Sequence, residues 1–233
     1  MGFEGRAPLM GGFLLHADDL LRGAPWVTRP ARPRAVLLHL LAFVLLFGLF
    51  YGLVMGSFGG VAGRRALQPL YSGVKVPLLL LVTFGLSLPS FFVLNSVLGV
   101  RGDFPYVLRG LIATQAALTI VLAALAPVTA FWYASSADYD TALLFNAFVF
   151  FVASVAAQFL LRRWYRPLVA RNGRHRTLLR AWLVIYAFVG IQMGWTLRPF
   201  VGHPHGETRF FREEAWGNAY VHVAEIFWRA VRK

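Results

Sequence analysis

The chain has 233 residues, of which 58% are hydrophobic and only 14% are charged, with a mean hydropathy of +0.60. Soluble domains carry about 25% charged residues, so this composition excludes an ordinary soluble domain. The charged residues are clustered, and the uncharged runs between them have roughly the 20-residue length of a helix that crosses a ~30 Å hydrocarbon core. The sequence therefore predicts an integral membrane protein of the all-α class.

The net charge is +13, and the arginines gather at the ends of the apolar runs. At these positions arginines set the topology of a membrane protein and anchor it to lipid headgroups. No basic patch lies on a recognisable soluble module, so nucleic acid is not expected as a partner. The chain has no cysteine, which excludes a disulfide framework, a thiolate nucleophile and a thiolate metal site.

Residues 1–34 form a predicted cytoplasmic N-terminal segment. A cleaved signal peptide is not expected there, because the segment contains acidic residues and lacks an apolar stretch followed by a small-residue cleavage site. A short interfacial helix is expected from an apolar stripe, which consists of Phe13, Leu14, Ala17, Leu20 and Leu21.

A membrane domain of five transmembrane helices is predicted for residues 35–200. The uncharged runs that define these spans cover residues 35–56, 76–100, 110–137, 141–161 and 181–197. Pro89 lies inside the second span and is expected to kink it, because proline removes a helix hydrogen bond.

The first span contains four glycines at four-residue spacing, namely Gly48, Gly52, Gly56 and Gly60. This spacing predicts a groove of small residues along one helix face, which another backbone can approach closely. Two occupants fit the groove. One is a neighbouring helix of the same bundle, and the other is a partner chain or a second copy, as in a subunit interface or a pore-lining glycine zipper.

The polar residues predicted to lie inside the spans include no acidic residue, and His39 is their only basic candidate. They are His39, Asn95, Gln115, Asn146, Gln158 and Gln192. Coupled proton or cation transport usually needs buried acidic groups, so this class is disfavoured. The amides are expected to form hydrogen bonds between helices. His39 is not favoured as a metal, haem or pigment ligand, because the sequence gives it no matched partner histidine.

The distribution of basic residues predicts a cytoplasmic N-terminus and an exported C-terminus. This orientation places 14 basic residues inside and 9 outside, with seven between residues 162 and 180 and none between residues 134 and 140. Anionic lipid headgroups are the expected partners of the arginine-rich loop, and the predicted phosphate ligands are Arg162, Arg163, Arg166, Arg174 and Arg176.

The chain is expected to leave the membrane near Trp195 and Arg198, which suit the headgroup region. An exported tail at residues 201–233 carries an apolar stripe typical of an amphipathic helix. Its predicted interface anchors are Trp216, Tyr220 and Phe227. His203 and His205 are candidate metal ligands, but no zinc-binding helix motif accompanies them, so no metal site is predicted.

No catalytic motif is found, so no catalytic residue and no cofactor are predicted. The expected function is a non-enzymatic scaffold or accessory subunit in a bacterial inner membrane, in contact with other membrane protein subunits or with further copies of itself. The alternative is an oligomeric channel or small-solute transport protein, built around the glycine face and the kinked second span.

The stretch from Leu98 to Arg109, Leu-Gly-Val-Arg-Gly-Asp-Phe-Pro-Tyr-Val-Leu-Arg, lies between two apolar spans and resembles the Yip1-like membrane proteins. The likeness covers about the middle third of the chain. It implies a five-span plan with a cytoplasmic N-terminus and a short exported tail. It also implies a role in membrane organisation and trafficking through protein partners, without a catalytic site.

Overall fold

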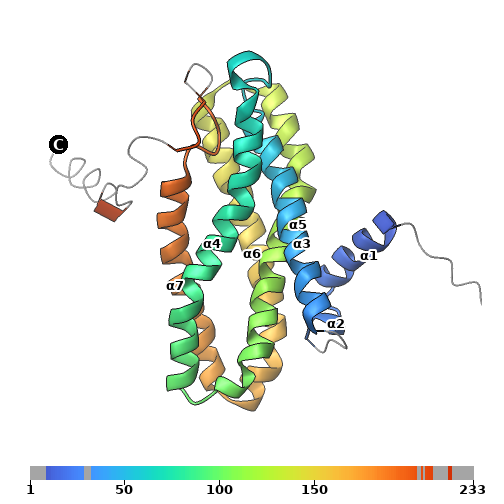
Figure 1. The fold of residues 1–233 in the computed structure, drawn as a ribbon, viewed down its shortest axis with the longest axis vertical. Coiled ribbons are helices and arrows are strands. Elements are labelled where there is room, and N and C mark those ends of the chain that lie inside the picture. The colour runs from blue at the N-terminus through green and yellow to red at the C-terminus, as the bar shows by residue number, and fades with distance from the viewer. Residues whose placement is uncertain (1–8, 29–32, 204–205, 207, 212–219, 222–233) are drawn as a thin grey trace, which may run out of the picture.

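A computed structural model describes the chain except for residues 1–8, 29–32, 204–205, 207, 212–219 and 222–233 (Figure 1). Every regular element among the described residues is helical, which confirms the predicted all-α class. The α-helices are α1 (Leu9–Leu21), α2 (Pro25–Thr28), α3 (Pro33–Gly56), α4 (Leu67–Val97), α5 (Phe104–Ser135), α6 (Tyr139–Arg171) and α7 (Arg174–Leu197). Short 3-10 turns occur at Gly63–Arg65 and Arg101–Asp103.

Five of these helices, α3 to α7, are long and apolar enough to cross a membrane, which confirms the predicted number. Most extend well beyond the predicted spans. For example, α6 has 33 residues and is about 50 Å long. The uncharged runs mark only the part of each helix that fits the hydrocarbon core, whereas the hydrogen-bonded helices continue past the first charged residues.

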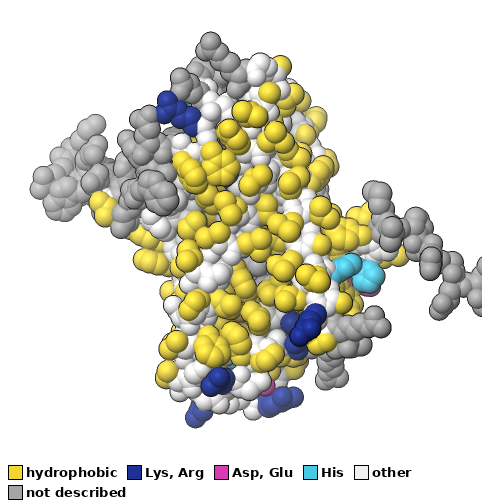
Figure 2. Space-filling view, in the orientation of Figure 1, with side chains coloured by type: hydrophobic (Ala, Val, Ile, Leu, Met, Phe, Trp, Pro, Cys, Tyr) yellow, Lys and Arg dark blue, Asp and Glu magenta, His cyan; other side chains and the backbone are white. Residues whose placement is uncertain are grey.

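The five long helices form an elongated bundle in which α5 is central and α7 is peripheral (Figure 1). Helix α5 packs against α3 and α6, α3 packs against α4, and α7 packs mainly on α4. In the most apolar 18-residue stretch of each helix, 72% of the residues are buried in α5 and 11% are buried in α7. Hydrophobic side chains cover the visible side of the bundle, and most visible basic side chains lie toward its lower end (Figure 2).

Helix α1 projects from the side of the bundle near the lower end of α3 (Figure 1). Its Phe13 ring lies 4.5 Å from the Phe43 ring and 5.7 Å from the Phe47 ring of α3. Leu14 and Leu15 on α1 are exposed. Helix α1 is therefore attached to the bundle through an aromatic contact and keeps apolar side chains on its outer surface.

The glycine face of α3 is occupied by α4. A Cβ atom added to Gly52 would lie 2.7 Å from the Cα of Gly73, and one added to Gly56 would lie 2.7 Å from the Cα of Pro69. These separations are too short for a side chain, so the backbones of α3 and α4 touch here. Of the two predicted occupants of the groove, the structure contains the neighbouring helix, which leaves no room for a partner chain on the same face.

The prediction that Gly60 belongs to this face is wrong. Helix α3 ends at Gly56, and Gly60 lies in the following loop with a φ of +104° and no atom within 4 Å of an added Cβ. A four-residue spacing keeps residues on one face only while the helix continues.

Replacing Gly52 with alanine is expected to lower the free energy of unfolding by ~1–3 kcal/mol, because the added methyl group forces α3 and α4 apart. The matched control is Gly85→Ala in α4, where nothing lies within 4 Å of an added Cβ. This control is expected to be neutral or slightly stabilising, since alanine is the better helix former. Thermal unfolding in detergent measures both variants, and equal stability of the two would contradict the described contact.

Candidate functional site

The first third of α4 carries a buried polar stripe that is formed by Gln68, Ser72 and Lys75. Spacings of four and three residues place these side chains on one helix face, and each is at most 1% exposed. The predicted second span starts at residue 76, which leaves Lys75 in the preceding loop and makes His39 the only basic candidate inside a span. Both predictions are wrong, because α4 begins at Leu67 and Lys75 is fully buried within it.

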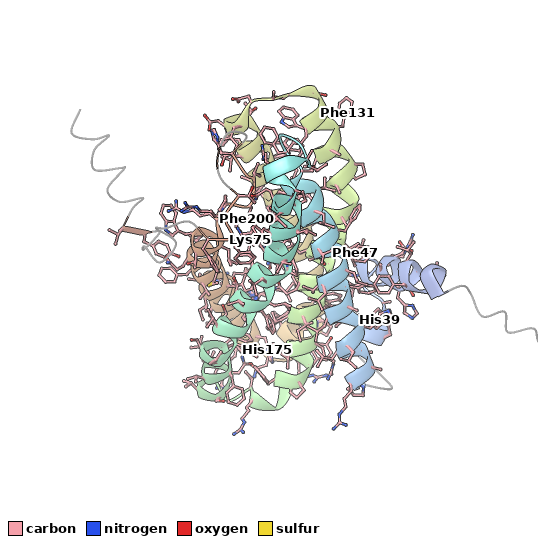
Figure 3. The ribbon with its side chains drawn as sticks, turned by 45° about the horizontal axis from the view of Figure 1, so that its top comes forward. His39, Phe47, Lys75, Phe131, His175 and Phe200 are labelled. Carbon is pink, nitrogen blue, oxygen red and sulfur yellow. The ribbon has the colours of Figure 1, made fainter. Side chains whose placement is uncertain are left out.

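The stripe binds the backbone of the segment that follows α7. The Lys75 ammonium donates a 2.7 Å hydrogen bond to the carbonyl oxygen of Pro199. The Ser72 hydroxyl donates to the carbonyl oxygen of Phe200, and the Gln68 amide donates to the same oxygen at 3.3 Å. Figure 3 shows Lys75 and Phe200 close together, toward the opposite end of the bundle from His175.

Two further side chains bind the next two carbonyl groups. The Tyr139 hydroxyl donates to Val201 at 3.3 Å, and the Arg65 guanidinium donates to Gly202 at 2.9 Å. Arg65 also donates to the carbonyl oxygen of Phe58 at 2.6 Å. Burial lowers the pKa of Arg65, but an arginine remains charged at neutral pH.

All four consecutive carbonyl groups from residue 199 to residue 202 therefore accept a hydrogen bond from a side chain. We call the donors the carbonyl cradle, which consists of Arg65, Gln68, Ser72, Lys75 and Tyr139. Irregular backbone in apolar surroundings needs such partners, because an unsatisfied carbonyl group costs several kcal/mol there. The buried Lys75 is satisfied by the same arrangement, and its ammonium also lies 4.9 Å from the centre of the Phe210 ring.

An apolar pocket of about 220 Å³ lies next to the cradle. Phe200 and Val201 form one wall, and Met55, Leu79 and Phe150 contribute others. The walls are apolar apart from Asn146, whose amide is already engaged in hydrogen bonds. The pocket therefore offers a surface for apolar groups only.

The predicted hydrogen bonds between helices are found for two of the amides. Asn146 on α6 accepts a 3.0 Å hydrogen bond from Tyr51 on α3 and donates one of 2.6 Å to Tyr133 on α5. Gln115 on α5 accepts a 2.7 Å hydrogen bond from Tyr186 on α7. Asn95 departs from the prediction, because its amide donates to the Phe91 carbonyl of its own helix.

A second set of contacts holds the other end of α7. The His175 ring nitrogen Nε2 lies 3.0 Å from the Asp103 carboxylate, and Arg174 donates a 2.9 Å hydrogen bond to the carbonyl oxygen of Leu98. His175 is 1% exposed. The predicted spans leave Asp103 and His175 in two separate loops, and no local sequence pattern links these loops. Helix α7 is thus bound to the rest of the bundle at both of its ends.

His39 has a neighbouring histidine that no local sequence pattern indicates. The His16 ring of α1 lies 5.0 Å from the His39 ring, in a cluster that includes Phe13 and Trp26. Within the described ranges, no group of three or more metal-ligating side chains occurs. His203 packs edge-on against Tyr139 at 4.8 Å, and His205 lies outside the described residues.

The predicted interface anchors are only partly described. The Arg198 guanidinium lies 3.2 Å from the centre of the Trp195 ring. Tyr220 stacks on Phe188 of α7 with a ring separation of 4.4 Å. Trp216, Phe227 and most of the predicted amphipathic helix lie outside the described residues.

The five predicted phosphate ligands do not point the same way. All five side chains are exposed. Arg163 lies against Gly23, 3.2 Å from the position of an added Cβ, and Arg174 is engaged with Leu98. Two of the five arginines, Arg163 and Arg174, therefore lie against other parts of the protein although they are exposed.

Replacing Lys75 with methionine is expected to increase hydrogen exchange in residues 196–203, because it removes a charged donor whose hydrogen bond contributes ~1.5–3 kcal/mol. Hydrogen exchange followed by mass spectrometry in detergent measures the change. Arg34→Met is the control, since it removes an exposed cation at the start of α3. Unchanged exchange in Lys75→Met would show that the cradle does not hold this segment.

The chain was compared with known protein families, curated proteins and solved structures. No protein-family model matches the chain, no curated protein matches its sequence, and no solved structure matches it. The function is therefore inferred from the residues described above.

Proposed function

We propose that this membrane protein is a non-enzymatic scaffold or accessory subunit of a larger membrane complex. The observation that supports the proposal is the carbonyl cradle, which binds four consecutive backbone groups after α7. These bonds fix the position and direction in which the C-terminal segment leaves the bundle. A fixed exit segment suits a protein that presents its tail to a partner in one orientation.

The packing of the bundle also favours a scaffold over the channel alternative. On the central helix α5, Leu111, Ala113 and Leu122 are fully buried and fill the space between helices. The polar side chains Tyr51, Asn146 and Tyr133 bind one another. The glycine face that would line a pore is covered by α4. Other membrane protein subunits and anionic lipids are the proposed partners.

The proposed location is a bacterial inner membrane, with the N-terminus in the cytoplasm and the C-terminus exported. The start of α3 and the loops at 98–103 and 172–173 lie at one end of the bundle (Figure 1), and this end carries most of the basic residues near the spans. Cytoplasmic loops are enriched in lysine and arginine. The resemblance to Yip1-like proteins implies the same orientation and the same kind of non-catalytic role.

Single cysteines provide a test of the orientation, because the chain has none of its own. In intact cells, a membrane-impermeant maleimide is expected to label Ser136→Cys, in the loop between α5 and α6. Asn172→Cys, in the loop between α6 and α7, should be labelled only after the membrane is opened. The reverse pattern would invert the proposed topology.

Purification in mild detergent provides a test of the scaffold role. The wild-type chain is expected to co-purify with other membrane proteins in a fixed stoichiometry, and Lys75→Met is expected to lower the recovery of that complex several-fold. Arg34→Met serves again as the charge-matched control. A wild-type chain that purifies alone and conducts ions in protein-only liposomes would overturn the scaffold proposal.

A further inference from the structure

The outer face of α6 carries a groove of about 230 Å³ near the arginine-rich end of the helix. Its lining residues follow one another at helical spacing on a single face, and they are Phe151, Ser154, Val155, Gln158, Phe159 and Arg162. Phe151, Val155 and Phe159 are exposed. The groove lies on the outside of a helix that is long and apolar enough to cross a membrane.

The chemical groups along this face follow the order of the groups in a phospholipid. Arg162 lies nearest the end of the helix, and Gln158 lies about 6 Å deeper along the helix axis. Phe151 lies about 10 Å deeper than Gln158. A glycerophospholipid presents a phosphate group first, then ester carbonyl groups and then acyl chains. A guanidinium suits the phosphate, an amide N–H suits an ester carbonyl group, and the apolar side chains suit an acyl chain.

Arg162 lies 6.0 Å from the centre of the Phe159 ring on the same face and makes no hydrogen bond to another residue of the described part of the chain. Among the described residues, neither Arg162 nor Arg166 forms an ion pair with a carboxylate. The Gln158 amide makes no hydrogen bond to another described residue, and its carbonyl oxygen is buried. The neighbouring Arg163 points instead toward Gly23.

We propose that this face of α6 is a binding site for one anionic phospholipid, with the phosphate on Arg162 and Arg166, an ester carbonyl group on Gln158, and an acyl chain along Val155 and Phe151. Arg166 lies four residues beyond Arg162 and therefore on the same face. Two cations without a nearby carboxylate favour a lipid with a net negative charge. The site is independent of the scaffold proposal, because it uses neither the cradle nor the exported tail.

Native mass spectrometry of the intact chain in detergent, titrated with phosphatidylglycerol or phosphatidylcholine, tests the proposal. Phosphatidylglycerol is expected to bind more tightly than phosphatidylcholine. Arg162→Ala is expected to weaken phosphatidylglycerol binding about fivefold, in line with the contribution of one basic residue at an anionic lipid surface. Gln158→Leu is expected to weaken both lipids, because both contain ester carbonyl groups.

Arg171→Ala is the matched control. It removes the same charge from an exposed position on the same helix, but nine residues further on, which is about two and a half turns and therefore the opposite face. It is expected to leave binding unchanged. Equal loss in Arg162→Ala and Arg171→Ala, or equal affinity for the two lipids, would overturn the site. Full competition by soluble glycerol phosphate would also overturn it, since the acyl chain would then contribute nothing.

Discussion

The close contact between the backbones of α3 and α4 determines where the polar groups at the upper end of the bundle lie. Gly52 lacks a side chain, so the backbone of Ser72 and Gly73 rests directly on α3. The side chain of the same Ser72 donates to the carbonyl oxygen of Phe200. One residue therefore joins the helix contact to the carbonyl cradle. Any change in the spacing between α3 and α4 also moves a donor of the cradle.

The number of spans and the close approach at the glycine face could be predicted, because both depend on patterns within a single stretch of sequence. Long uncharged runs identify membrane helices, and glycines four residues apart identify one face. The ends of the helices were harder to predict. Lys75 stands at the edge of an uncharged run, where hydropathy separates it from the span. Its place inside α4 depends instead on a carbonyl acceptor at Pro199, which lies far along the sequence.

Only the acceptor segment of the candidate site could be predicted from the sequence. The sequence predicts that the chain leaves the membrane near Trp195 and Arg198. The donors to the carbonyl groups that follow lie on α4, on the turn at Gly63–Arg65 and at the start of α6. Local sequence patterns do not indicate contacts between residues that lie so far apart in the chain. The one available signal was the spacing of Gln68, Ser72 and Lys75, which places three polar side chains on one face of a helix.

The partners in the cradle are synthesised at very different times. Lys75 precedes its acceptor Pro199 by 124 residues. At a translation rate of ~5–20 residues per second, the acceptor follows the lysine after roughly 6–25 s. During this interval α4 carries a cation without its final hydrogen-bond partner. Lys75 can be enclosed only after α7 is in place, so the last span to be made completes the burial of a residue near the start of the second.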